Sequence, residues 1–478
     1  MLERCLRRCG AVLVALLTVC ASLPAGESRA GRVDPPNILF VYLDDFGWRD
    51  AGFMGSDFYE TPHLDRLAGE GMVFSAAYAC AANCAPSRAC LLSGQYTPRH
   101  GIFNVGTRPR GNAKHRRLEH VPGTTTLDPD IVTWAELLQA NGYRTGMFGK
   151  WHLGTTPEQQ GFDVAVQHNA LPGFRGHLGP DGQYLADVLT DRAIEFIREN
   201  REGPWCAYLA HFAVHTPLQP KPELLGKYTA KEPGDLHDHV VMATMIQAVD
   251  DGVGRILAAL EELDLDERTV IVFSSDNGGF GPATDMAPLK GYKGTYYEGG
   301  IRVPFFVRWP GVVEAGGESH VPISGIDVFP TLCEIAGFEV PADKTLDGLS
   351  LVPLLKGDAE PFEDRALFWH FPAYLQSYSV IDEQRDPLFR TRPCSVIRVG
   401  RWKLHQYFED SGLELYDLAD DITESENVAV RHPEKVASLL GRLTAWQEAT
   451  GAPVPTEPNP EFDAAAESAA IERALRRR

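Results

Sequence analysis

The stretch N-I-L-F-V-Y-L at residues 37–43 is a continuous apolar run that stops abruptly at Asp44 and Asp45. A strand that is apolar at every position is typical of a strand buried on both faces of a parallel sheet. Similar runs occur in Y-R-T-G-M-F-G-K (143–150), W-C-A-Y-L-A-H-F-A-V-H (205–215) and T-V-I-V-F-S-S (269–275), and helical patterns at 131–143, 187–200 and 240–263 lie between them. This alternation predicts an α/β fold with a doubly wound, mostly parallel sheet and helices on both faces.

Polar side chains follow each of these apolar runs. In doubly wound sheets, ligands bind beyond the carboxyl ends of the strands. An Asp after a strand is most often only a turn former or a helix cap. Repetition at the same structural position favours one shared crevice, formed by Asp44, Asp45, Lys150, His152, His215, Asp276 and Asn277.

The acidic members of this set have the chemistry of a metal site. Asp44, Asp45, Asp276 and Asn277 offer hard oxygen ligands, which suit Ca²⁺ or Mg²⁺ and suit zinc poorly. Carboxylates crowded together would repel each other unless a cation lay among them. The sequence therefore predicts a divalent cation.

Cationic side chains surround the predicted metal. Arg88, Lys150, His152, His215 and Lys293 would complement the charge of an oxyanion such as phosphate or sulfate. The strongest candidate for a nucleophile is Cys84, in the stretch N-C-A-P-S-R-A-C-L-L-S-G at residues 83–94.

The stretch C-A-P-S-R (84–88) followed by L-L-S-G resembles the signature of the type I, formylglycine-dependent sulfatases of the alkaline-phosphatase-like superfamily. Further segments are similar to blocks of that family in the same order, from about residue 36 to about residue 430. They include N-I-L-F-V-Y-L-D-D-F-G-W, G-Y-R-T-G-M-F-G-K-W-H-L-G, A-V-H-T-P, S-S-D-N-G-G, Y-K-G-T-Y-Y-E-G-G-I-R-V-P and E-L-Y-D-L-A-D-D-I-T-E-S-E-N-V-A.

The resemblance implies a sulfuric ester hydrolase with a modified cysteine. A maturation enzyme would oxidise Cys84 to formylglycine, and one Ca²⁺, with Mg²⁺ as second choice, would be bound by Asp44, Asp45, residue 84, Asp276 and Asn277. An unmodified thiolate would be left sulfonated with no easy route to turnover, whereas an aldehyde hydrate can expel sulfate through its second hydroxyl.

The same resemblance assigns roles to the cationic residues. Arg88 would position the aldehyde hydrate, and Lys150 and Lys293 would bind sulfate oxygens. His152 would assist the second hydroxyl, and His215 would protonate the leaving alcohol. Lys293 is preferred over Lys290 because it occupies the Lys-Gly-Thr position of its block.

The net charge of the chain limits the kinds of macromolecule that it can bind. The formal net charge of -20 argues against nucleic acid as the main partner. The clearest basic cluster, T-R-P-R-G-N-A-K-H-R-R-L-E-H at 107–120, is either a solvated loop or a surface that attracts a sulfated glycan. The second hypothesis would use Arg108, Arg110, Lys114, Arg116 and Arg117.

Residues 1–30 are predicted to be a cleaved signal peptide, with basic residues before a short apolar run. A lipid anchor at Cys20 is disfavoured because Val19 fits poorly before it. No later segment is apolar enough to be an integral membrane span. We therefore expect an exported, periplasmic or secreted protein acting on a sulfated small molecule or glycan, in particular an extracellular carbohydrate sulfate.

We expect a catalytic domain over residues 31–365 and a smaller α+β domain over 366–455 with an antiparallel sheet and one helix. The tail, 456–478, is expected to fray. A Cys80–Cys90 disulfide is permitted but not predicted. Asp250 and Asp251 are expected to be a solvated or structural pair, and further histidines are expected at the surface or the substrate rim: His168, His177, His237, His239 and His370.

Two alternatives differ from a sulfatase. A phosphodiesterase or phosphonate hydrolase of the same superfamily would use a similar metal and cation cradle, although such enzymes commonly have a Thr or Ser nucleophile and zinc ligands. A non-catalytic glycan-binding relative would keep the fold without turnover, but here every expected catalytic position is occupied.

Overall fold

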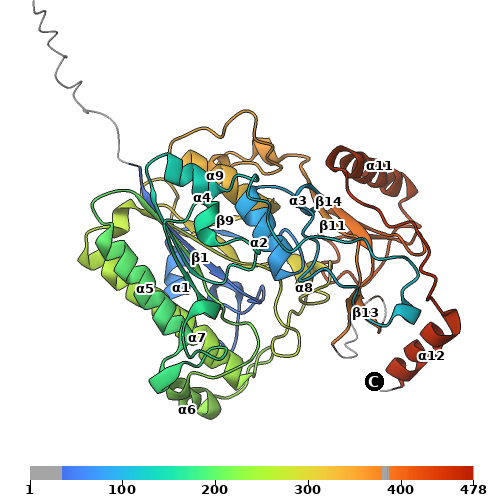
Figure 1. Cartoon of the computed structure of the whole chain (residues 1–478), viewed down its shortest axis with the longest axis horizontal. Helices are drawn as coiled ribbons and strands as arrows, with labels where there is room; N and C mark the ends of the chain where they lie inside the picture. The colour runs from blue at the N-terminus through green and yellow to red at the C-terminus, as the bar shows by residue number, and fades with distance from the viewer. Residues whose placement is uncertain (1–34, 379–384, 386, 477–478) are drawn as a thin grey trace, which may run out of the picture. The chain divides into compact units, whose positions relative to one another are not determined.

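The computed structural model describes residues 35–378, 385 and 387–476. Its main sheet, in which Figure 1 labels β1 and β9, has eight strands, and their order is β5-β4-β6-β1-β7-β8-β2-β9. The five strands from β5 to β7 are all parallel, whereas β8 runs antiparallel to both of its neighbours. The prediction of a mostly parallel sheet is confirmed. The bounds are β1 Asn37–Leu43, β2 Met72–Phe74, β4 Arg144–Gly149, β5 Val164–Gln167, β6 Trp205–Ala210, β7 Thr269–Ser275, β8 Phe305–Arg308 and β9 Gly317–Ser319.

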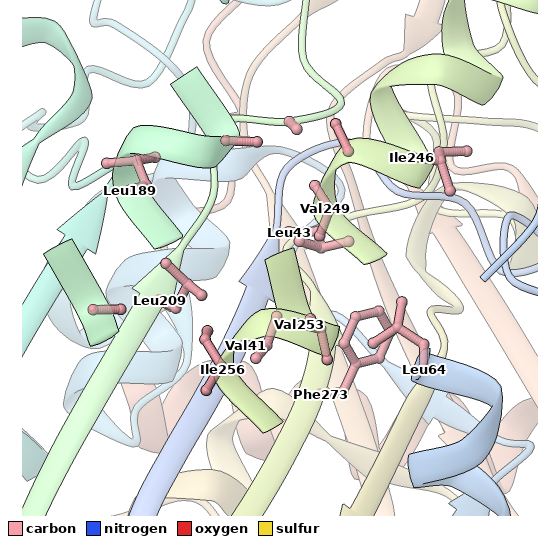
Figure 2. Packing of buried hydrophobic residues seen from close by; sticks show 14 of the residues in the cluster. Val41, Leu43, Leu64, Leu189, Leu209, Ile246, Val249, Val253, Ile256 and Phe273 are labelled. Carbon is pink, nitrogen blue, oxygen red and sulfur yellow. The ribbon is translucent and has the colours of Figure 1, made fainter. Parts of the chain in front are cut away.

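Strand β1 is buried on both faces, as its unbroken apolar run predicts. Leu39, Val41 and Leu43 belong to one core cluster, and Ile38, Phe40 and Tyr42 belong to another. Figure 2 shows Val41 and Leu43 facing Val249 and Val253 of a long helix, α7 (Val240–Glu262). Helices therefore cover both faces of the sheet, and the doubly wound architecture is confirmed.

The helices divide between these two core clusters. On the side of Leu39 pack α1 (Pro62–Gly69), α5 (Leu185–Glu199), α6 (Pro222–Ala230) and α7 (Val240–Glu262). On the side of Ile38 pack α2 (Cys84–Ser93), α4 (Trp134–Ala140), α9 (Val328–Ile335) and α10 (Val352–Leu355). Further short elements are α3 (Thr97–His100), α8 (Glu298–Ile301), and two ribbons formed by β3 (Ala77–Tyr78) with β10 (Ile323–Ser324) and by β12 (Leu375–Gln376) with β13 (Phe389–Thr391).

Asp250 is a structural residue inside α7. Its carboxylate accepts hydrogen bonds from the backbone N–H groups of His63 (3.1 Å) and Leu64 (2.9 Å), in the first turn of α1. These N–H groups have no partner within their own helix, so the contact fixes α1 against α7. Burial raises the pKa of Asp250 to about 7. The expectation of a structural role is confirmed for Asp250.

A second, antiparallel sheet lies toward the C-terminus. It comprises β11 (Ala366–Phe371), β14 (Cys394–Val399), β15 (Trp402–Tyr407) and β16 (Leu413–Asp417). Its buried Leu404 and Leu415 pack against Leu439 and Leu443 of α11 (Pro433–Thr450). The predicted antiparallel sheet with a helix is therefore confirmed, and the described residues from Pro35 onward form one compact unit.

The one helix predicted for residues 366–455 is α11, but the tail that was expected to fray contains a further helix. Residues Ala464–Leu475 form a further helix, α12. The Asp463 carboxylate accepts hydrogen bonds from the N–H groups of Ala465 (3.1 Å) and Ala466 (3.0 Å), which caps the helix. Buried Glu467 then pairs with Arg392 at 2.8 Å and with Arg117 at 3.1 Å. These distant ion pairs hold a segment whose composition alone suggests disorder.

The predicted signal peptide and Cys20 lie outside the described residues. Over the residues that the structure does describe, no helix is long and apolar enough to cross a membrane. The cysteines at 80, 84, 90, 206, 333 and 394 are all buried free thiols, so Cys80 and Cys90 are not bridged in this structure.

Candidate active site

Four neighbouring parallel strands supply the site. In the order β4-β6-β1-β7, their carboxyl ends lie side by side at one edge of the sheet. Lys150 follows β4, His215 lies beyond β6, Asp44 and Asp45 follow β1, and Asp276 follows β7. Because parallel strands end at the same edge, residues more than two hundred positions apart meet there.

The carboxylates at this edge form a tight buried cluster. Leu43 pairs with Ser275 in the β1–β7 register, which brings the following residues together. The Asp45 N–H donates to Asp276 Oδ1 at 3.2 Å, and Asn277 Nδ2 donates to Asp45 Oδ1 at 2.8 Å. Burial and the nearby Asp44 raise the pKa of Asp276 well above its usual range. A divalent cation would relieve this crowding of negative charge.

Two oxygens of the cluster test whether a metal fits. Asp44 Oδ1 and Asn277 Oδ1 are buried and have no hydrogen-bond partner among the described residues. A buried acceptor without a partner is costly unless it binds a ligand. Both oxygens are hard donors, so the cluster fits Ca²⁺ or Mg²⁺.

Cys84 is the first residue of α2 and is only 2% exposed. Its Sγ and one carboxylate oxygen each of Asp44 and Asp276 all lie within 4.8 Å of one another. The N-terminal end of a helix favours negative charge because its first N–H groups lack intrahelical partners. Cys84 is therefore next to the metal-binding oxygens, in a position suited to an anion.

Arg88 follows one helical turn after Cys84 and is 1% exposed. Its Nε and Nη2 both lie 2.9 Å from Asp276 Oδ2, and its Nη1 donates to the Lys150 carbonyl at 3.0 Å. Arg88 thus links α2 to the ends of β7 and β4 and fixes the position of the first turn of α2, which carries Cys84.

Lys150 and Lys293 are the cations nearest to the cluster. Lys150 Nζ pairs with Asp44, and Lys293 Nζ lies 2.6 Å from Asp45 Oδ1. Burial acts to lower the pKa of each lysine, but the carboxylates outweigh it and hold each pKa above the usual value. Both ammonium groups therefore stay charged.

Lys290 lies elsewhere. Its Nζ donates to the Glu424 carbonyl at 3.1 Å and lies 4.0 Å from the centre of the Tyr297 ring. The structure thus brings Lys293, and not Lys290, to the predicted crevice.

Both predicted catalytic histidines line the same cavity as Cys84. His215 Nδ1 donates to the Thr216 carbonyl at 2.7 Å, which leaves Nε2 facing Asp45 Oδ2 at 3.8 Å. Burial lowers the pKa of His215, although Asp44 and Asp45 oppose this effect. Burial, followed by the charge of Lys150, lowers the pKa of His152 to about 4.

The other histidines differ from the prediction in part. His177, His237 and His370 are buried, so the expectation of a surface or rim position is wrong for them. His177 Nε2 donates to the His215 carbonyl at 2.8 Å and so supports that residue. His168 lines the cavity, whereas His239 caps α7 by accepting from the Met242 N–H at 3.1 Å.

The cavity has a volume of about 380 Å³. Besides the predicted residues it is lined by others that no sequence motif marked, including Asn104, Tyr378 and Arg390. These residues come from loops and from the short strand β13, which explains why sequence periodicity gave no signal for them.

The basic stretch 107–120 is anchored and not freely solvated. Arg117 pairs with Glu467, and Arg116 Nη1 donates to the Gly111 carbonyl at 2.8 Å. Arg108 is exposed, and Arg110 reaches the cavity wall. The five cations proposed to attract a glycan are therefore not equivalent.

The fold and the site define a class of hydrolase that acts on oxyanion esters, with a nucleophile, oxygen ligands for a hard metal and two lysines at the end of a doubly wound sheet. The family model "Sulfatase" matches residues 36–338, and the model "N-sulphoglucosamine sulphohydrolase, C-terminal" matches residues 292–448. The chain belongs to the sulfatase family, and it is a sulfuric ester hydrolase.

Relatives with known names are similar in sequence over most of the chain. A sulfatase of Formosa agariphila is 31% identical, covering 91% of this chain and 93% of its own. Human N-acetylgalactosamine-6-sulfatase is 33% identical (72% and 70%), and mouse steryl-sulfatase is 32% identical (77% and 72%). The crystal structure of Ps i-CgsB in complex with k-i-k-neocarrahexaose superimposes with a TM-score of 0.72 at 28% identity, covering 92% of this chain and 98% of that chain.

Proposed function

We propose that this sulfatase removes sulfate from an extracellular carbohydrate, using a formylglycine made from Cys84 and one calcium ion. The observation that carries the proposal is the location of Cys84. Its sulfur lies among the ligand oxygens of Asp44 and Asp276, in a cavity that Lys150 and Lys293 also line. Nucleophile, metal ligands and oxyanion-binding cations thus share one site.

The proposed calcium ligands are the side chains of Asp44, Asp45, Asp276 and Asn277, together with residue 84. Asp44 Oδ1 and Asn277 Oδ1 support this set of ligands, because both are buried and have no hydrogen-bond partner among the described residues. Calcium accepts many protein oxygens in a flexible arrangement, whereas magnesium usually keeps several waters and uses few carboxylates. A cage of four oxygen-bearing side chains therefore favours calcium, with magnesium as second choice. The bound ion would stabilise negative charge on a sulfate oxygen.

When hydrated, the formylglycine would supply a geminal diol: attack of one hydroxyl on sulfur would release the alcohol, and loss of the proton from the other hydroxyl would then release sulfate and restore the aldehyde. Supply of this group requires a maturation enzyme during biogenesis. Lys150 and Lys293, both held in the charged form, would bind the remaining sulfate oxygens. Arg88, fixed by Asp276 and the Lys150 carbonyl, would hold residue 84 in line with the ester.

Two imidazoles would move protons. His215 Nδ1–H is committed to the Thr216 carbonyl, so Nε2 is the atom that would deliver a proton to the leaving alcohol. The low pKa of His152 keeps its imidazole neutral at physiological pH, as acceptance of a proton from the second hydroxyl requires.

Three observations support an extracellular carbohydrate as the substrate. The printed names of relatives include an N-acetylgalactosamine-6-sulfatase and a complex with neocarrahexaose. The N-terminal leader suggests export, and most of the residues that line the cavity have polar side chains. Because mouse steryl-sulfatase is equally similar, a steroid sulfate belongs in the substrate panel.

The decisive experiment examines residue 84 and the metal in one preparation. The enzyme is coexpressed with a formylglycine-generating enzyme, and the peptide containing residue 84 is examined for loss of sulfur and reaction with a hydrazide. We expect turnover of an aryl sulfate to scale with the modified fraction, to vanish on exhaustive chelation and to return with Ca²⁺. Full turnover by protein that retains the Cys84 sulfur would contradict the proposal.

A parallel panel addresses the phosphoryl-transfer alternative. The Agrobacterium radiobacter phosphonate monoester hydrolase shares this fold, with a TM-score of 0.65 at 22% identity, covering 87% of this chain and 96% of that chain. Aryl phosphate and aryl phosphonate esters are therefore compared with the aryl sulfate. A higher kcat/KM for either phosphorus ester would exclude sulfate as the preferred group.

A further inference from the structure

Two arginines from distant segments line the cavity that holds Cys84. Arg110 belongs to the loop after α3, and Arg390 belongs to β13. Neither residue is part of the metal cluster, and no step of the proposed reaction uses them. Three buried arginines, Arg88, Arg302 and Arg392, pair with carboxylates, and the surroundings of Arg110 and Arg390 differ from theirs.

Arg390 is 4% exposed and is held by neutral groups. Its Nη1 donates to the Lys293 carbonyl at 3.0 Å, and its Nε donates to the Gln376 carbonyl at 3.1 Å. Its guanidinium carbon lies 3.6 Å from the centre of the Tyr378 ring, which fixes the guanidinium plane. These bonds leave N–H groups of the guanidinium open to a ligand.

Arg110 is half-buried, and its Nη2 donates to the Val105 carbonyl at 2.6 Å. Among the described residues, no carboxylate forms an ion pair with either Arg110 or Arg390. Arg392, only two positions further on, pairs with Glu409 at 2.6 Å and with Glu467 at 2.8 Å. A chain with a net charge of -20 thus neutralises one arginine of this segment and leaves its neighbour at the cavity without a counter-charge.

The two guanidinium groups line the same cavity, so each positive charge disfavours the other. Burial lowers the pKa of Arg390, and the charge of Arg110 is among the causes that lower it further. Two like charges that face one cavity without an acid are stabilised when an anion binds between them.

We propose that Arg110 and Arg390 bind a second anionic group of the substrate, so that this sulfatase prefers sugars carrying a carboxylate or another sulfate in addition to the scissile one. The inference rests on the proposed function and narrows it to polyanionic saccharides. Because Arg390 is bonded to the Lys293 carbonyl, the second anion would lie near the sulfate-binding lysine. This places it on the same sugar or on its immediate neighbour.

Competition against an aryl sulfate tests this proposal. The competitors are N-acetylglucosamine 6-sulfate with one charge, glucosamine 2-N,6-O-disulfate with a second sulfate, and a 6-sulfated disaccharide with a uronate. We expect the wild-type enzyme to bind at least one doubly charged sugar about tenfold more tightly than the singly charged sugar. The disulfate and the uronate separate the two sources of the second charge.

The substitution Arg110→Gln should abolish that tenfold preference. The matched control Arg108→Gln removes the same charge from the same loop, but at an exposed position outside the cavity, and should keep the preference. Arg390→Lys retains the charge without the forked geometry and should lose part of the preference.

The proposal is overturned if the wild-type enzyme shows no preference, or if Arg108→Gln reduces it as much as Arg110→Gln does. A failure of the proposed function has a different signature, namely no turnover of any sulfate ester by protein with residue 84 modified. Calorimetric titration of the full-length calcium-loaded protein with the same three sugars would then still test the arginine pair.

Discussion

Two clusters of buried lysines and carboxylates in this protein have similar chemistry and different surroundings. At the edge of the main sheet, Lys150 and Lys293 pair with Asp44 and Asp45 and border a cavity. At the C-terminal sheet, Lys403 of β15 lies 2.9 Å from both Glu298 and Glu424, and all three side chains are completely buried.

The difference shows what converts an ion pair into a reactive site. The first cluster borders a cavity and holds a nucleophile, so a metal and a substrate can complete it. The second is sealed and links α8, β15 and the loop after β16. We therefore expect substitutions in the first cluster to reduce activity and substitutions in the second to reduce stability.

The largest effect should come from residue 84. Cys84→Ala removes the precursor of the nucleophile and should reduce kcat by on the order of 10⁴-fold or more. The control is Cys333→Ala, a buried thiol of α9 outside the cavity, which should retain turnover. Initial rates on an aryl sulfate, with thermal melting of both variants, provide the measurement. Comparable rates for the two variants would contradict the site.

The lysines of the first cluster should come next. Lys293→Ala removes one positive charge at the position of the developing sulfate charge and should lower kcat by about 10²–10³-fold. Lys290→Ala is the matched control because Lys290 packs on Tyr297, away from the cavity. Steady-state kinetics of both variants would show the difference, and an equal loss would argue against the assignment of Lys293.

The sealed cluster should respond in the opposite way. Lys403→Met leaves Glu298 and Glu424 as buried charges without their lysine and should lower the free energy of unfolding by about 3–5 kcal/mol. Turnover per folded molecule should not change. Denaturant unfolding combined with active-site titration separates the two quantities, and a loss of kcat at full stability would refute the distinction between the clusters.

Asp250 is a buried carboxylate of a third kind, with no cation paired to it among the described residues. Among the described residues Asp250 forms no ion pair, and its pKa of about 7 lies above the usual 3.8. Because the folded state holds this proton more tightly than the unfolded state does, the stabilisation is complete below about pH 4. It is lost as the pH rises through 7.

Between pH 5 and 7 this linkage should cost roughly 2 kcal/mol of unfolding free energy. Asp250→Asn should remove that part of the pH dependence, while Asp251→Asn, at the half-buried neighbour, should retain it. Urea unfolding across this pH range would show the difference. Parallel curves for wild type and Asp250→Asn would exclude the raised pKa.

Local patterns were sufficient to predict the main sheet and the convergence of its site residues. The run at 37–43 is apolar at every position because β1 is covered on both faces, and parallel pairing then fixes where Asp44 and Asp276 lie. The metal and the modification of Cys84 remain proposals, because the residue types allow them and only chemistry on the protein can establish them.

Tertiary contacts account for what the sequence did not predict. Helix α12 is held by ion pairs of Glu467 with Arg117 and Arg392. Because these partners are far apart in the sequence, no local pattern predicts the pairs. Arg390 is part of the cavity wall only because β13 lies near Lys293. His177 and His370 were predicted at the surface or the substrate rim, but each is buried and forms a hydrogen bond with a residue from another segment.

The segment before α12 also forms hydrogen bonds with the loop that carries Arg110. Asn459 Nδ2 donates to the carbonyls of Ala113 (2.9 Å) and Arg116 (2.7 Å), and the Asp463 N–H donates to the Lys114 carbonyl at 3.0 Å. During synthesis, one side of the substrate entrance must therefore wait for the segment that contains Asn459 and Asp463 to leave the ribosome. A shortened or C-terminally fused protein would be the natural place to look for an enzyme that still cleaves sulfate but has become less selective.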